Sequence, residues 1–216
     1  MYFWRPQLLN PLFALEECLR FKITSFVRIE ILLVFVLYAL FLAWSAYLVY
    51  AHDSAYLYKE NGLIENMQVA ALVIGCIVFF MPVVWPIGRD KLLHLFFSFL
   101  CYSFILRELD IERFDVPEIV KFIGSGVGRD VSYAIGFLSL MAYALWHFSY
   151  YKARFKDYAR SASFFLFLAS GVVLFLGGSF EDFKSVPHHV YIEEIVELAG
   201  FSLLVVSALF LYKQPI

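Results

Sequence analysis

Long uncharged runs constrain the fold of this chain more than any other feature of its sequence. Ile31–Tyr50 carries no charged side chain, and Leu198–Tyr212 is another run of 15 residues without one. About 20 consecutive apolar residues are enough for a helix to cross the hydrocarbon core of a bilayer. The 216-residue chain is 62% hydrophobic, whereas a soluble domain is roughly half apolar. The sequence therefore predicts an integral membrane protein.

We predict an all-α fold, a polytopic membrane helix bundle of about six transmembrane helices in a single domain, 1–216. The expected spans are 31–50, 64–87, 92–109, 131–151, 161–180 and 192–212. In residues 1–28, leucines recur at helical spacing among charged side chains, which predicts an interfacial amphipathic helix. Pro117–Ile123 is expected to form a short interfacial helix. The glycine-rich segment that follows is expected to be a turn, with Asp130 capping the next span.

The distribution of lysine and arginine predicts the orientation of the bundle. Of the 17 such residues, 11 fall on one side of the predicted spans and six on the other. Short loops rich in Lys and Arg stay in the cytoplasm. We therefore expect the N- and C-termini to be cytoplasmic, in a bacterial inner membrane. No basic stripe marks the chain, so nucleic acid is not an expected partner.

Two of the predicted spans are short, and this locates a candidate site in depth. Leu92–Leu106 and Leu198–Tyr212 each hold 15 uncharged residues, or roughly 22 Å of a hydrocarbon core that is ~30 Å thick. If both helices cross fully, their outer turns lie inside the bilayer. Ionisable side chains at that depth are costly and usually functional. We expect them to face a protein interior or an aqueous cavity at the non-cytoplasmic edge.

The residues of these outer turns suggest specific roles. His189, Glu193 and Glu197 recur every four residues, so they share a helix face. With Asp182 they are our candidate ligands for a divalent metal ion of unknown identity. Our candidate catalytic residues are Glu65, Glu108 and Arg107, the arginine holding an anionic substrate such as a phosphate headgroup. Glu194 is expected to serve a neighbouring group or to pair with Arg107.

These residues favour a metal-dependent or acid–base enzyme that acts on a lipid or lipid-linked substrate. Three alternatives stay open. Arg107 could pair with Glu108, Glu65 or Glu197 in a structural ion-pair network. The chain could instead be an accessory or assembly subunit bound to another membrane protein. It could also be an ion- or proton-coupled transporter, because intramembrane carboxylates often mark such routes.

One short motif is similar to a known family. Asp90-Lys91-Leu92-Leu93-His94 resembles the D-K-x-x-H opening of VanZ-like membrane proteins. The similarity covers these five residues alone, and we assign the chain to no family on that basis.

Overall fold

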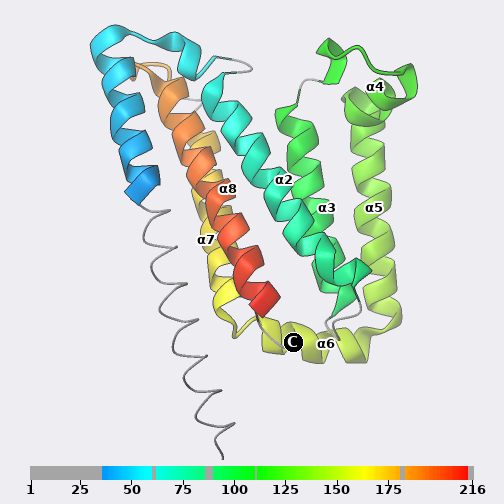
Figure 1. Cartoon of the computed structure of the whole chain (residues 1–216). Helices are drawn as coiled ribbons and strands as arrows, with labels where there is room; N and C mark the ends of the chain where they lie inside the picture. Colours follow the sequence, from blue (N-terminus) through cyan, green and yellow to red (C-terminus); the bar gives the residue numbers. More distant parts are fainter. Residues whose placement is uncertain (1–35, 60–61, 86–89, 110, 181–182, 214–216) are drawn as a thin grey trace, which may run out of the picture. The chain divides into compact units, whose positions relative to one another are not determined.

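The computed structural model is helical in both compact units of the chain (Figure 1). It describes residues 36–59, 62–85, 90–109, 111–180 and 183–213. One unit ends at Ser54 and the other is Ala55–Ile216. In the first unit, the described helix Val36–His52 overlaps the first predicted span. The predicted amphipathic helix 1–28 lies outside the described residues, and the prediction of a single domain for the whole chain stays a prediction.

The second unit contains the helices that surround the candidate site. They are η1 Ala55–Leu57, α2 Leu63–Val84, α3 Lys91–Glu108, η2 Ile111–Arg113, α4 Glu118–Gly124, α5 Gly126–Trp146, α6 Phe148–Tyr158, α7 Ala162–Ser179 and α8 His189–Lys213. Each later predicted span overlaps one of the longer helices. The short helix expected after Pro117 is present as α4, and its place at the membrane interface stays a prediction. An all-α fold is confirmed for the part of the chain that the structure describes.

Fewer helices than the predicted six are suited to crossing a membrane. Among the described residues, α2, α7 and α8 are long and apolar enough, and α5 with α6 makes a fourth if the bent pair is one span. α3 is an 18-residue helix that begins at Lys91 and ends with Arg107 and Glu108. These charges leave it an uncharged run too short for a full span. The helices are consistent with an integral membrane protein.

The predicted span 131–151 is broken in the structure. α5 ends at Trp146, and α6 leaves it at an angle of 105°. α6 carries Lys152, Arg154, Lys156 and Asp157, and these charges explain why the chain does not continue along the apolar axis of α5.

The expected glycine-rich turn and the cap at Asp130 were wrong. α5 begins at Gly126, so Asp130 lies within the helix, and Ser125 occupies the N-cap position. Gly126 has φ +52, which is the left-handed region. A Cβ at Gly128 would collide with the backbone carbonyl of Phe122. The glycines therefore allow a tight junction between α4 and α5 and not an extended loop.

The core of the second unit lies where α2, α3, α7 and α8 pack against one another (Figure 1). Its buried side chains include Leu72, Phe79, Phe97, Phe201 and Leu204. Between helices in a bilayer, side chains of this kind contribute through van der Waals packing, because lipid tails are as apolar as they are.

The α7–α8 pair is the most extensive of these contacts, and it is built from small residues. Ser170 Oγ donates to the Gly200 carbonyl over 2.8 Å, and Ser163 Oγ donates to the Ser207 carbonyl over 3.0 Å. In the other direction, Ser207 Oγ donates to the Ser163 carbonyl over 2.9 Å. Small side chains let two helix backbones approach closely in a membrane.

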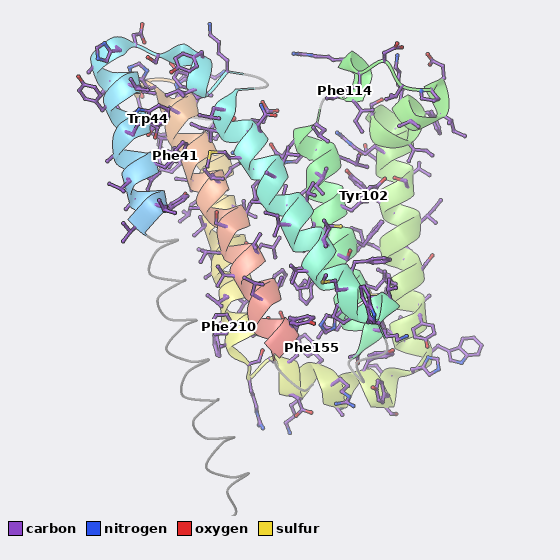
Figure 2. All side chains as sticks on the ribbon, in the orientation of Figure 1. Phe41, Trp44, Tyr102, Phe114, Phe155 and Phe210 are labelled. Carbon is purple, nitrogen blue, oxygen red and sulfur yellow. The ribbon has the colours of Figure 1, made fainter. Side chains whose placement is uncertain are left out.

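α5 packs against α3 more loosely, along what we call the α3–α5 seam (Phe99, Ser103, Tyr133 and Gly136). Tyr133 Oη donates to the Ser103 carbonyl over 2.6 Å. The opposite side of α5 is exposed, as Figure 2 shows for its outward-pointing side chains. In a bilayer that apolar side would contact lipid.

Candidate functional site

An arginine between two carboxylates forms the centre of the candidate site, where α3 ends. Arg107 Nε donates to Glu108 Oε1 over 2.8 Å, and Arg107 Nη2 donates to both oxygens of Glu197 over 3.0 and 3.1 Å. The arginine side chain is 50% exposed, whereas each carboxylate side chain is 11% exposed. The pairing of Arg107 with Glu108 and Glu197 that the sequence suggested is confirmed.

α8 brings Glu197 to this arginine, and α7 leaves room for it. Glu197 is almost fully buried. A Cβ at Gly177 of α7 would lie 2.9 Å from Glu197 Cγ, so a larger residue there would push the carboxylate aside. The small-residue packing of the α7–α8 pair therefore fixes the position of a charged group. A buried carboxylate needs a cationic partner such as Arg107, because an unpaired buried charge would be strongly destabilising.

A second carboxylate of α8 is held by an amide from α2. Gln68 Nε2 donates to Glu194 Oε2 over 2.8 Å and to the Glu194 backbone carbonyl over 2.9 Å. Gln68 is fully buried. Glu194 thus accepts hydrogen bonds from a neighbouring helix, as expected, and the described donor is Gln68. The two bonds join α2 to α8 one turn away from Glu197.

A pocket of about 340 Å³ opens beside the Arg107 cluster. Its polar walls come from the start of α2, the end of α3, η2 and the start of α5. The lining residues are Glu65, Arg107, Glu108, Leu109, Ile111, Glu112, Arg113, Gly124, Ser125, Gly126 and Arg129. We call this the α3-end pocket. Its volume lies at the lower end of the range for small-molecule sites, so it would hold a headgroup-sized ligand.

The α5 wall of the α3-end pocket is cationic. Arg129 Nη1 reaches the Leu106 carbonyl at 3.4 Å, and its Nε lies 3.6 Å from Asp130 Oδ1. Arg129 Nε is buried, and no described residue accepts a hydrogen bond from it. The Ser125 side chain gives no capping bond to α5, because its Oγ donates to the Lys121 carbonyl over 2.7 Å.

The candidate catalytic residues Glu65, Arg107 and Glu108 meet in this pocket. Glu65 lies in the first turn of α2 and is half-buried. Arg107 was expected to hold an anionic substrate, but much of its hydrogen-bonding capacity is taken by Glu108 and Glu197. Its arrangement suits a group that pairs with two carboxylates and orients them.

The candidate metal ligands are only partly placed. His189 begins α8, and both His189 and Glu193 are half-buried. Asp182 lies outside the described residues. Within the described part of the chain, no three His, Cys, Asp or Glu side chains come together in a way that could hold a metal ion. The metal site stays a prediction that depends on Asp182.

The opposite end of α3 has a buried polar pair of its own. Asp90 caps the helix, because its Oδ1 accepts from the backbone N–H groups of Leu92 and Leu93 over 3.1 and 3.3 Å. His94 Nδ1 lies 2.9 Å from the Asp90 carbonyl. Both residues are more than 90% buried. The Asp90–His94 motif therefore has a local structural role, about 20 Å along the helix from Arg107.

Sequence reasoning missed Arg129, Arg113 and Ser125 as parts of the site. The glycine-rich segment was taken for a turn, so the arginine after it was counted only as a loop charge. A usable signal was present, because serine is one of the residue types favoured at a helix N-cap, and Ser125 precedes the predicted span. Comparison with protein-family models, with curated proteins and with solved structures finds no match to this chain.

Proposed function

We propose that this chain is a multi-pass membrane enzyme that performs acid–base chemistry on a lipid or lipid-linked substrate. The observation that supports this most is the Arg107 cluster beside the α3-end pocket. Two carboxylates of that pocket, Glu65 and Glu108, lie within reach of a bound ligand. Paired carboxylates can divide the roles of proton acceptor and donor when they sit in different surroundings.

The surroundings of the two carboxylates differ. Glu108 is bound by Arg107 at the end of α3, and its side chain is 11% exposed. Glu65 lies in the first turn of α2 and lines the same pocket. We assign the roles of proton acceptor and proton donor to these two carboxylates as a pair. The reacting group would lie between the ends of α2 and α3.

A turnover assay tests the proposal. The full chain, purified in detergent, would be incubated with a total membrane lipid extract, and the lipids would be followed by mass spectrometry. We expect Glu108→Gln and Glu65→Gln to slow product formation by about 100-fold or more, the usual effect of removing a general acid or base. Glu118→Gln is the matched control, because Glu118 is an exposed residue of α4 outside the pocket. Wild-type turnover in both pocket variants would contradict the proposal.

A metal-assisted version of the reaction is tested separately. Elemental analysis would compare the wild-type chain with the Glu193→Ala/Glu197→Ala double variant. Stoichiometric metal that is lost in the variant would support His189, Glu193, Glu197 and Asp182 as ligands. Equal metal content in both proteins would remove these ligands from the mechanism.

We also propose that the α3-end pocket faces the non-cytoplasmic side, with both termini in the cytoplasm. The support is the clustering of Lys152, Arg154 and Lys156 on α6, which follows the other end of α5. Reporter fusions after Lys156 and after Ser185 would report opposite sides of the membrane. The same side for both would contradict this orientation.

A further inference from the structure

The charges of the α3-end pocket are divided between its walls. Glu65 belongs to α2, whereas Arg129 belongs to α5. These two helices flank α3, which packs against both (Figure 1). η2 adds an adjacent pair of opposite charges, Glu112 and Arg113. The pocket therefore carries an acidic residue on its α2 side and a basic residue on its α5 side, with both signs on α3 and η2 between them. We call the α2 side the acidic wall and the α5 side the basic wall.

The basic wall suits a phosphate group. Arg129 offers a buried Nε–H for which no described residue provides an acceptor, and Arg113 lines the same pocket. The first turn of α5 begins at Gly126, which lines the pocket, and no side chain caps this helix end. Guanidinium groups and the positive end of a helix dipole both favour a bound phosphate. The arginines carry this argument, and the helix end adds to it.

The acidic wall excludes a ligand that is only negative. Glu65 and Glu108 both line the pocket, and Glu197 lies behind Arg107. Arg107 donates to Glu108 and Glu197, so an anion on the α2 side of the pocket would lie near the Glu65 carboxylate and be repelled by it. A protonated amine on the α2 side would turn this repulsion into an attraction.

We propose that the α3-end pocket binds a zwitterionic phosphate ester, with its phosphate at Arg129 and Arg113 and its protonated amine at Glu65. The ligand class is a phosphoethanolamine group, which an aminophospholipid headgroup or a soluble ester can supply. The proposal rests on the proposed function, because it names the substrate class of the same pocket.

Isothermal titration calorimetry on the full chain in detergent tests the proposal. Glycerophosphoethanolamine should bind at least about tenfold more tightly than glycerophosphoglycerol, which lacks the amine. Arg129→Gln and Glu65→Gln should each weaken glycerophosphoethanolamine binding by about tenfold, the size expected for a charge-assisted hydrogen bond. Lys121→Gln is the matched control, because Lys121 lies on α4 and does not line the pocket.

Further arms separate the sources of the ligand and the effects of misfolding. A short-chain phosphatidylethanolamine that binds more tightly than the soluble ester supports a lipid source, and equal affinity supports a soluble one. Arg129→Lys keeps the charge and should recover part of the affinity if the fold is intact. Equal binding of glycerophosphoglycerol, or unchanged affinity in Arg129→Gln, would overturn the proposal. Binding is measured without turnover, so failure here leaves the acid–base assignment to its own assay.

Discussion

The α7–α8 pair and the α3–α5 seam are both contacts between helices, but they differ in how closely the two helices pack. In the α7–α8 pair, Ser163, Ser170 and Ser207 bond directly to backbone carbonyls of the facing helix. In the α3–α5 seam, Tyr133 and Arg129 supply the described bonds, and pockets open on either side of Tyr133. The close contact fixes Glu197, whereas the looser one leaves room for a ligand beside it.

Arg107 connects the two regions, so its removal should have the largest effect. Arg107→Ala leaves Glu108 and Glu197 without their cation. We expect a loss of about 2–3 kcal/mol in the free energy of unfolding, towards the low end for a broken buried pair, because Arg107 is half exposed. Chemical denaturation in mixed micelles measures it. A loss no greater than that of Lys121→Ala would show that the cluster does not stabilise the bundle.

A matched pair of glycine substitutions compares the two regions directly. At Gly200 in the α7–α8 pair, a Cβ would lie 2.6 Å from Leu174 Cγ and 3.4 Å from the Leu174 backbone nitrogen. At Gly136 in the α3–α5 seam, it would meet the far end of the Phe99 ring, which borders a pocket of about 490 Å³.

We expect Gly200→Ala to cost about 1–2 kcal/mol, because overpacking outweighs the gain in helix propensity. Gly136→Ala should change stability by less than about 0.5 kcal/mol, because the ring can turn into the open pocket. Thermal unfolding of both variants in one detergent measures the difference. Equal losses would mean that the two contacts are equally close-packed.

Tyr133→Phe tests how far the α3–α5 seam depends on one hydroxyl. The variant loses the 2.6 Å bond to the Ser103 carbonyl, and we expect a cost of about 1 kcal/mol. Hydrogen exchange should rise in α5 and not in α7 or α8. Uniform exchange changes across all helices would indicate that the seam is not an independent region.

Asp130→Asn should have the smallest effect. Asp130 is 71% exposed, and its 3.6 Å pair with Arg129 is long. Exposed pairs of this kind contribute about 0–1 kcal/mol, and we expect less than about 0.5 kcal/mol here. The same variant should leave Arg129 more available to a ligand. A large loss of stability would show that Asp130 holds the start of α5 after all.

Much of the helical fold could be predicted from the sequence, but the break between α5 and α6 could not. Apolar runs located α2, α7 and α8 to within a few residues. The break at His147 carries neither proline nor glycine, so the predicted span continued to Tyr151. What ends α5 is the set of charges that begins at Lys152, an effect of the surroundings and not of backbone propensity.

The candidate site shows the same division. The charged residues at the ends of two short apolar runs were enough to predict that Arg107 and Glu197 lie at the same depth. The depth of a residue along a spanning helix depends only on its position in the sequence. The partner of Glu194 depends on how α2 is rotated against α8, which no local pattern records. Arg129 was missed because its position depends on the α4–α5 junction, where Gly128 allows contact with the Phe122 carbonyl.

The right-angled turn into α6 limits how α5 can move in a bilayer. Sliding α5 outward along its own axis would draw Lys152, Arg154 and Lys156 into hydrocarbon, at about 2.5–3.5 kcal/mol for each charge at full depth. If α6 lies at the membrane surface, tilting α5 about His147 would meet no such penalty. In that arrangement Arg129, near the far end of α5, would move further than the residues next to His147.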